Sequence, residues 1–241
     1  MNESEKIWKE FLNEVDLKFT SYIPIIQNNT NYVAVIVETR KHEDLLLSIR
    51  STMYYLNEFK SNVKWGLQIF HGSDNKDFIK FITKDWKNVN YENLEVDELT
   101  KKQYNNLLMT SDFWKKIKGE KILIFQTDSV LLRHGIDEFL EYDYVGAPWR
   151  KSKEGQFIGN GGLSLRTKEV MINICDNYKE TEHIWEDIYF IKHLKGQGVP
   201  DIEIAKRFSM EDVFSPNPLG VHNPIRHIEP SSLKEVLFKN I

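Results

Sequence analysis

The stretch that decides the fold is residues 121–129, with the sequence KILIFQTDS. Its first five residues form an apolar run that predicts a strand buried on both faces of a sheet. Polar residues follow directly, with Asp128 between the hydroxyl side chains of Thr127 and Ser129. A carboxylate in this position can be a turn or helix-capping residue, or it can bind a divalent cation that bridges phosphates. The residue alone leaves both interpretations open.

Strands and helices alternate before this stretch. The predicted order is a strand at residues 32–37, a helix at 42–59, a strand at 63–72, a helix at 74–84, a strand at 88–96 and a polar helix at 100–117. Alternation of this kind favours an α/β fold, in which helices flank a mostly parallel sheet with right-handed crossovers.

Polar groups follow three of the predicted strands. They are Glu38-Thr39-Arg40, His71-Gly72, and the segment from Gln126 to Ser129. Ligands of open parallel sheets bind beyond the carboxyl ends of the strands. We therefore expect these three groups to converge on one crevice.

Composition excludes several classes of protein. The net charge is −4 and the pI about 6.0, so there is no overall positive field and we expect no nucleic-acid partner. Cys175 is the only cysteine and lies in an apolar run, which favours a core position and rules out an intrachain disulfide. We find no signal peptide or spanning helix, and we expect a cytoplasmic protein.

Residues 3–19 carry an apolar stripe at helical spacing. Such a stripe can dock on its own domain, on a partner or on a membrane surface, and the first is the commonest. Peripheral membrane association therefore stays open, and the sequence does not indicate an oligomeric state. No repeat or linker marks a boundary, which favours a single domain over residues 1–241.

The second half of the chain is dense in glycine and aromatic residues. Glycines let a backbone approach a ligand closely, so Gly161 and Gly162 beside Asn160 can form a sugar-binding segment, or a plain β-turn. Trp149 follows a proline and offers a flat face to a sugar ring, although core packing is equally consistent. His222, in a loop fixed by glycine and prolines, can supply a nitrogen ligand to the metal at Asp128, or can bond only to backbone.

Two adjacent acids, Glu186 and Asp187, follow Trp185 and open an apolar segment that predicts a helix start. Acidic residues at a helix N-terminus need no further role, since they interact favourably with the helix dipole. One of them can also act as a general base toward an incoming hydroxyl, and Asp187 is the first choice, with Glu186 second.

Five blocks together resemble a known family. They are FQTDS at residues 125–129, YDYVGAPW at 142–149, GNGGLSLR at 159–166, ED at 186–187 and PLGVH at 218–222. In this order the blocks resemble a little-characterised DUF-type family of GT-A glycosyltransferases, over roughly residues 32–228. The resemblance implies a GT-A-like, Rossmann-like domain with a nucleotide-binding half at about 32–125, an acceptor and catalytic half at about 126–228, and terminal helices.

The resemblance also implies roles for the site residues. The donor would be a nucleotide-diphosphate sugar bound by Glu38, Thr39, Arg40, Gln126, Asp128 and Ser129. Asp128 stands where the family's Asp-x-Asp motif normally lies, and Asp187 where inverting relatives keep their base. This chain has Thr-Asp-Ser instead of two aspartates, so Mn²⁺ or Mg²⁺ would rest on Asp128 and His222, with Ser129 completing the shell, or Arg40 would offset the phosphate charge instead.

The activity expected from this resemblance is that of a hexosyltransferase-like enzyme in polysaccharide biosynthesis. It would move the sugar to a hydroxyl of a glycan acceptor, with inversion. A non-catalytic glycan or nucleotide-sugar binding module is the first alternative. A sugar nucleotidyltransferase is the second, although that class normally has a glycine-rich signature after the first strand, where this chain has Glu38-Thr39-Arg40.

Overall fold

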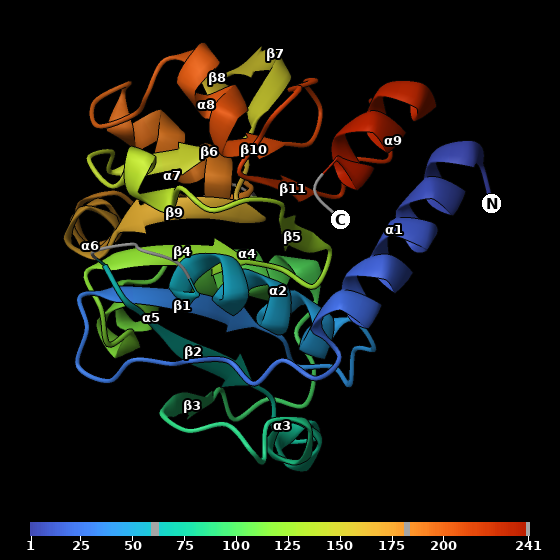
Figure 1. Cartoon of the computed structure of the whole chain (residues 1–241). Helices are drawn as coiled ribbons and strands as arrows, with labels where there is room; N and C mark the ends of the chain where they lie inside the picture. Colours follow the sequence, from blue (N-terminus) through green and yellow to red (C-terminus); the bar gives the residue numbers. More distant parts are fainter. Residues whose placement is uncertain (59–62, 181–183, 240–241) are drawn as a thin grey trace.

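The computed structural model of the chain describes residues 1–58, 63–180 and 184–239. At its centre is a six-stranded sheet with the order β3-β2-β1-β4-β9-β6 (Figure 1). The strands are β1 (Tyr32–Val37), β2 (Trp65–His71), β3 (Val89–Asn93), β4 (Lys121–Phe125), β6 (Tyr144–Gly146) and β9 (Leu163–Thr167). β1, β2, β3 and β4 run parallel, whereas β9 is antiparallel to both β4 and β6. The predicted α/β fold with a mostly parallel sheet is confirmed.

Helices cover both faces of the sheet, because its strands are apolar on both sides. Val33 and Val35 of β1 pack into one core, whereas Ala34 and Ile36 pack into the other. The helices around these two cores are α2 (Leu45–Asn57), α3 (Lys76–Ile82) and α8 (Ile202–Phe208) on one side, and α4 (Lys101–Leu108), α5 (Ser111–Lys116), α6 (Lys168–Asn177) and α7 (Glu186–Leu194) on the other. Cys175 is fully buried in the second core, as its apolar surroundings in the sequence predicted.

The prediction of one helix over residues 100–117 is wrong, because the segment forms two helices, α4 and α5. Thr110 separates them in an extended conformation, and its hydroxyl accepts a hydrogen bond from Phe113 N at 3.4 Å. A side chain that caps a new helix thus interrupts the periodic pattern. The other elements agree in kind, and α2 ends at Asn57, while the predicted end at Phe59 lies outside the described residues.

A second, three-stranded sheet positions the site. It has the order β10-β11-β5, formed by β10 (Ser209–Met210), β11 (Gly220–His222) and β5 (Ser129–Leu131). β5 and β11 are antiparallel, and Ser129 pairs with His222. This pairing brings the residue after Asp128 beside a histidine from the far end of the chain. The short helix η1 (Ile136–Phe139) and the hairpin of β7 (Pro148–Lys153) and β8 (Gln156–Ile158) complete the middle region.

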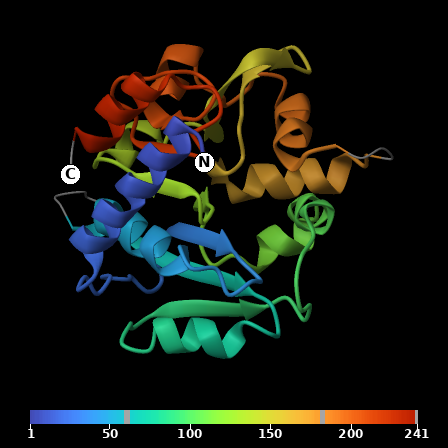
Figure 2. The same cartoon turned by 90° about the vertical axis from the view of Figure 1, so that its right-hand side faces the viewer.

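The terminal helices α1 (Glu3–Phe19) and α9 (Pro230–Phe238) lie side by side at one flank of the molecule (Figures 1 and 2). The stripe of α1, including Phe11 and Val15, is buried against Leu233 and Val236 of α9 in a third apolar cluster. The stripe predicted from the sequence therefore packs on its own domain. In the described part of the chain, no helix combines the length and apolar character that crossing a membrane needs.

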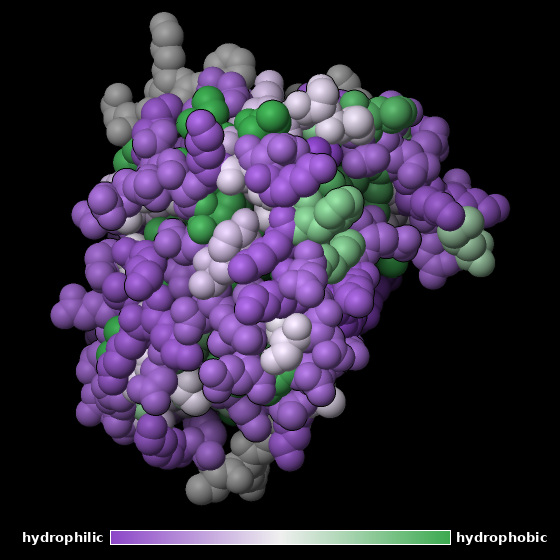
Figure 3. Space-filling model, turned by 90° about the horizontal axis from the view of Figure 1, so that it is seen from below, coloured by the Kyte–Doolittle hydropathy of each residue, from purple (hydrophilic) through white to green (hydrophobic). Residues whose placement is uncertain are grey.

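The face of the molecule below the view of Figure 1 is polar. In Figure 3, which shows the molecule from below the view of Figure 1, most residues are hydrophilic, and the apolar ones are scattered among them. Phe81 of α3 is one of the exposed apolar side chains in the described chain. Scattered exposed apolar residues are normal for a protein surface and do not by themselves mark a binding face.

Candidate active site

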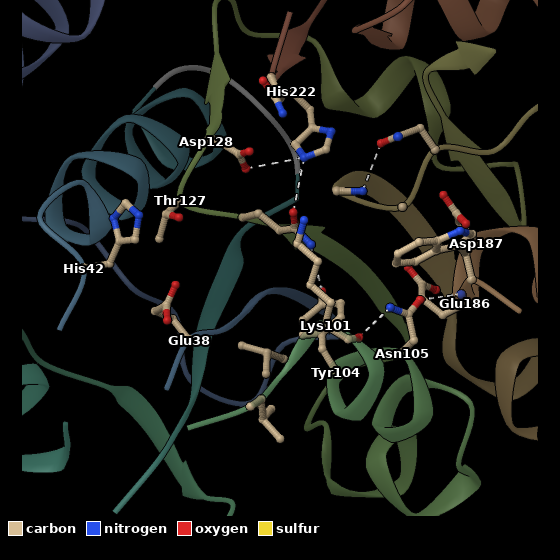
Figure 4. Close-up of a pocket in the computed structure, with 18 of the residues that line it drawn as sticks. Glu38, His42, Lys101, Tyr104, Asn105, Thr127, Asp128, Glu186, Asp187 and His222 are labelled. Carbon is tan, nitrogen blue, oxygen red and sulfur yellow. Dashed lines mark hydrogen bonds and ion pairs between the residues drawn. The ribbon is translucent and has the colours of Figure 1, made fainter. Parts of the chain in front are cut away.

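A cleft of about 490 Å³ opens beyond the carboxyl ends of β1 and β4, as the sequence predicted for this kind of sheet (Figure 4). Eleven of the thirteen site residues predicted from the sequence line it. They are Glu38, Thr39, Arg40, Gln126, Asp128, Asn160, Gly161, Gly162, Glu186, Asp187 and His222. The third expected strand end does not reach the cleft, because His71 is buried and its Nδ1 lies 2.7 Å from the carbonyl oxygen of Gly72.

Asp128 and His222 form one wall of the cleft. Asp128 Oδ1 lies 3.4 Å from His222 Nε2, and the same nitrogen lies 3.2 Å from Gln126 Oε1 (Figure 4). Burial would lower the pKa of His222, but Asp128 and Glu211 outweigh that effect and raise it to about 10. Burial would likewise raise the pKa of Asp128, yet His222 lowers it below its usual value. The wall is thus a histidine cation held between carboxylates.

Glu211 is the second carboxylate at this histidine, and the sequence did not point to it. Its Oε1 lies 3.4 Å from His222 Nδ1, on the opposite side of the ring from Asp128. Its Oε2 and the histidine Nδ1 are buried and make no hydrogen bond within the described chain. An unsatisfied buried carboxylate oxygen is costly, so such an atom marks a position that a further ligand can complete.

The two glycines of the GNGG block are required by close packing inside the site. A Cβ on Gly162 would lie 2.1 Å from His222 Nε2, and a Cβ on Gly161 would lie 2.1 Å from a carboxylate oxygen of Glu186. Neither position has room for a side chain. Asn160 braces the turn, because its Oδ1 accepts a hydrogen bond from Gly162 N at 3.0 Å.

Glu186 is held in a buried ion pair. Its two carboxylate oxygens accept hydrogen bonds from Arg166 Nη1 and Nη2 at 2.6 and 2.9 Å. Trp114, Tyr144 and Phe190 pack around the guanidinium of this fully buried arginine. Both oxygens of Glu186 are thereby committed, so the structure favours a positioning role over the second-choice base role predicted for it.

Asp187 lies on the wall of the cleft opposite Asp128. No cation of the described chain forms an ion pair with its carboxylate. Its Oδ1 accepts a hydrogen bond from Ile188 N at 2.7 Å. Burial, reinforced by the charge of Glu186, raises the pKa of Asp187 to about 6. A carboxylate of this basicity is mostly ionised at neutral pH, yet it binds a proton more readily than an ordinary aspartate.

The end of β1 forms the third side of the cleft. The Arg40 guanidinium donates to both oxygens of Glu38, at 2.9 Å from Nε and 2.8 Å from Nη2. The Thr39 hydroxyl accepts a hydrogen bond from Leu99 N at 2.9 Å. Glu38 therefore already neutralises the charge of Arg40. This arrangement weakens the expectation that Arg40 by itself offsets the negative charge of the phosphates.

Helix α4 contributes residues that sequence analysis missed. Lys101, Tyr104 and Asn105 line the cleft from one face of this helix, and Asn105 Oδ1 accepts a hydrogen bond from Glu186 N at 2.7 Å (Figure 4). The Tyr104 hydroxyl accepts a hydrogen bond from Gln126 Nε2 at 3.2 Å. Their spacing on a helix was visible in the sequence, but nothing there indicated which face meets the sheet.

Two predicted residues do not line the cleft. Trp149 is only 4% exposed and packs in the core beside α7, so the flat face expected for a sugar ring is covered. Ser129 is buried, and its hydroxyl donates to Gly162 O at 3.0 Å, so it supports the glycine turn. The exposed tryptophan of the cleft is Trp185, with 47% of its surface accessible, directly before the two acids.

The sheet and the cleft together define a GT-A-like α/β protein, and two solved glycosyltransferase structures share this fold. The first is the apo form of glycosyltransferase GlyE from Streptococcus pneumoniae TIGR4, with a TM-score of 0.51 and 10% identity over 80% of this chain and 54% of that chain. The second is mouse xyloside xylosyltransferase 1 in its apo form, with a TM-score of 0.54 and 11% identity over 80% of this chain and 97% of that chain. This chain thus spans about half the length of GlyE, and identities this low show the fold alone.

Residues 88–222 match the model of DUF5672, which is described as a protein of unknown function, and the chain belongs to this family. The match covers the blocks on which the resemblance rested. No curated protein matches the sequence significantly.

Proposed function

We propose that this protein is a glycosyltransferase that moves a sugar from a nucleotide-diphosphate sugar to a hydroxyl of a glycan acceptor, with inversion. One observation carries the proposal. A single cleft holds Asp128 and His222 on one wall and Asp187 on the opposite wall, in a fold shared with glycosyltransferases. The proposal assigns the nucleotide to the half at about residues 32–125, and the acceptor and the catalytic groups, including Asp128 and His222 at the diphosphate, to the half at about 126–228.

A divalent cation, Mn²⁺ or Mg²⁺, fits the wall formed by Asp128 and His222. Their facing atoms are 3.4 Å apart, which is close enough for both to contact one ion at about 2.1 Å each. Glu211 faces the other ring nitrogen, where ligating histidines usually meet an orienting carboxylate. When bound, the ion would neutralise the charge that develops on the leaving nucleotide diphosphate.

Two protein ligands suffice for such an ion, because Mg²⁺ commonly shares its coordination with substrate phosphates and water. The described chain contains no cluster of three or more His, Cys, Asp or Glu side chains arranged to hold a metal, so the proposed ion would have only two protein ligands. Binding would also require His222 to release the proton that its raised pKa retains. Lys101 and Arg226, which line the cleft and make no ion pair with a described residue, are the cations that support binding of the diphosphate.

Asp187 is the proposed general base. Its carboxylate would accept the proton of the acceptor hydroxyl while the hydroxyl oxygen attacks the anomeric carbon of the donor. The bond from that carbon to the diphosphate oxygen breaks, and the nucleotide diphosphate leaves from the opposite side. Direct displacement of this kind inverts the configuration at the anomeric carbon, and Asp187 needs its proton-free form to support it.

A ligand panel tests the proposal. UDP, GDP, CDP and ADP are added to the protein with and without Mn²⁺, and the melting temperature is followed, since a ligand that binds only the folded state stabilises it. We expect one nucleotide to stabilise the protein more strongly with Mn²⁺, and Asp128→Asn to abolish that increase. Asp187→Asn should retain nucleotide binding and lose transfer.

The outcomes separate the alternatives. No response to any nucleotide would refute the donor site. Nucleotide-sugar binding without transfer or donor hydrolysis would support a non-catalytic binding module. Synthesis of a nucleotide sugar from a nucleoside triphosphate and a sugar phosphate would support a nucleotidyltransferase.

A further inference from the structure

The hairpin of β7 and β8 carries an unusual concentration of positive charge. Residues 148–158 contain three cations, Arg150, Lys151 and Lys153, and a single acid, Glu154, whereas the whole chain has a net charge of −4. All four of these side chains belong to exposed residues. The donor site does not account for the three cations, because none of them lines the cleft.

The hairpin stands at the mouth of the cleft. Its second strand ends at Ile158, and the chain continues directly into Asn160, which lines the cleft. The base of the hairpin is fixed there, because Ala147 O accepts hydrogen bonds from Gly159 N at 3.3 Å and from Asn160 N at 3.1 Å. The cations of the hairpin are therefore carried on the same backbone that forms the wall of the site.

Contacts on the two sides of the hairpin show where its cations lie relative to the cleft. Lys153 Nζ lies 5.3 Å from the ring centre of Trp149, and Lys153 is among the charges that act on the Asp187 carboxylate. On the other side, Arg150 Nη1 lies 3.4 Å from His227 Nδ1, next to Arg226 at the edge of the cleft. Lys153 therefore brings the positive charge of the hairpin near the proposed base, while Arg150 lies beside His227, the neighbour of the Arg226 assigned above to the diphosphate.

Acidic groups near this surface do not cancel it. Asp212 lies 3.5 Å from His227 Nε2 and faces that histidine. Glu154 is a single acid, exposed at the turn between the two strands, against the three cations of the hairpin. Glu186 is neutralised by Arg166 inside the protein.

We propose that the β7–β8 hairpin binds an anionic glycan acceptor, whose carboxylate or phosphate groups contact Arg150, Lys151 and Lys153 while its terminal sugar hydroxyl reaches Asp187. This inference rests on the proposed function and names the acceptor class of the same site. Trp185, half exposed beside Asp187, provides an aromatic face for the terminal sugar.

A glycan explains the position of the charge better than a membrane surface does. The cations gather at the opening of a site for a hydroxyl acceptor, and Phe157 is the large apolar residue that the hairpin exposes, at 49%. Stable binding to a lipid surface normally combines basic residues with a larger apolar face.

Binding of defined glycans to the whole protein tests the proposal. The probes are a hexamer of galacturonic acid, a glycerol-phosphate oligomer and neutral maltohexaose, each titrated in the presence of Mn²⁺ and the nucleotide found to stabilise the protein. We expect at least one anionic oligomer to bind and maltohexaose not to bind. The carboxylate and phosphate probes identify which anionic group the hairpin accepts.

The variant Arg150→Gln, Lys151→Gln, Lys153→Gln removes the charge of the hairpin. An exposed ion pair contributes up to about fivefold in affinity, so losing three should weaken anionic binding by up to about 100-fold. The matched control is Lys76→Gln, Lys80→Gln, Lys84→Gln on α3 and the turn that follows it, at the far end of the molecule from the hairpin (Figure 1), which removes the same charge and should bind like wild type. A thermal melt of each variant checks that it is folded.

Several results would overturn the proposal. They are equal affinity for neutral and anionic oligomers, equal loss in the hairpin and α3 variants, or no glycan binding by a protein that binds its nucleotide. Binding of phosphatidylglycerol vesicles without binding of either anionic oligomer would assign the hairpin to a membrane surface instead. The nucleotide titration of the wild-type protein tests the proposed function separately, so the two failures are distinguishable.

Discussion

Asp187→Asn should abolish transfer and at the same time make the protein more stable. The pKa of this carboxyl rises from 3.8 to about 6 in the folded protein, because burial and Glu186 disfavour its charge. Each tenfold change in an ionisation equilibrium is about 1.4 kcal/mol, so the ionised carboxylate lowers the free energy of unfolding by about 3 kcal/mol. An asparagine avoids that cost and still accepts the hydrogen bond from Ile188 N.

The effect has a definite pH dependence. Below pH 3.8 the carboxyl is protonated in the folded and unfolded states, and the substitution should change nothing. As the pH rises through about 6 the folded protein must ionise Asp187, so the stabilisation by asparagine becomes complete above pH 7 and is about half as large at pH 5. For a chain of this size, about 3 kcal/mol corresponds to an increase in melting temperature of about 6–12 °C at pH 8.

Thermal melts at pH 5 and pH 8 measure this prediction, and the rate of transfer by the wild-type protein should rise through the same pH region. Glu186→Gln, one residue earlier, is the control. It leaves the buried charge of Arg166 without its partner and should lower the free energy of unfolding by about 3–5 kcal/mol. Equal melting temperatures for wild type and Asp187→Asn at pH 8, or the same gain at both pH values, would refute the reasoning.

Three further predictions concern packing and exposure. Gly162→Ala should displace His222 and abolish the Mn²⁺-dependent part of nucleotide binding, measured by titration with and without the metal. Trp185→Ala should reduce transfer and lower the melting temperature less than Trp149→Ala does, because Trp149→Ala should cost about 3–5 kcal/mol of stability, as loss of a buried tryptophan does. The Cys175 thiol, whose pKa burial raises to about 12, should react with iodoacetamide only after unfolding, as mass spectrometry will show.

Strands β1 and β4 at the centre of the sheet were predictable because each is a local apolar run. Residues 32–37 and 121–125 carry their own signal, and the rule for parallel sheets then located a cleft at Glu38 and Asp128 without knowledge of the packing. His71 shows the limit of the rule, because it also follows a strand yet turns into the protein. A strand end predicts a place in the sheet but not the direction of each side chain.

The site residues that sequence analysis missed are brought to the cleft by contacts between distant segments of the chain. Glu211 joins the site because it directly follows β10, and β10 pairs with the strand that ends at His222, a pairing that no local pattern announces. Trp149 is buried in the core cluster that includes α7, whereas Trp185 is exposed where α7 begins, and this difference arises from packing between distant segments. Local sequence therefore gave the framework of the site, while long-range packing decided which side chains face the cleft.

The two consecutive glycines also fix the dimensions of the site. Gly162 touches the proposed metal wall and Gly161 touches the helix that bears the proposed base, so neighbouring residues of one strand end connect both walls. Consecutive Cα atoms are 3.8 Å apart across a trans peptide, a length that no side-chain exchange alters. In the proposed reaction, the backbone of Gly161 and Gly162 would therefore set the spacing between the leaving nucleotide diphosphate and the incoming hydroxyl. We expect relatives that change donor or acceptor to do so at the rim of the cleft while keeping this short segment at the same length.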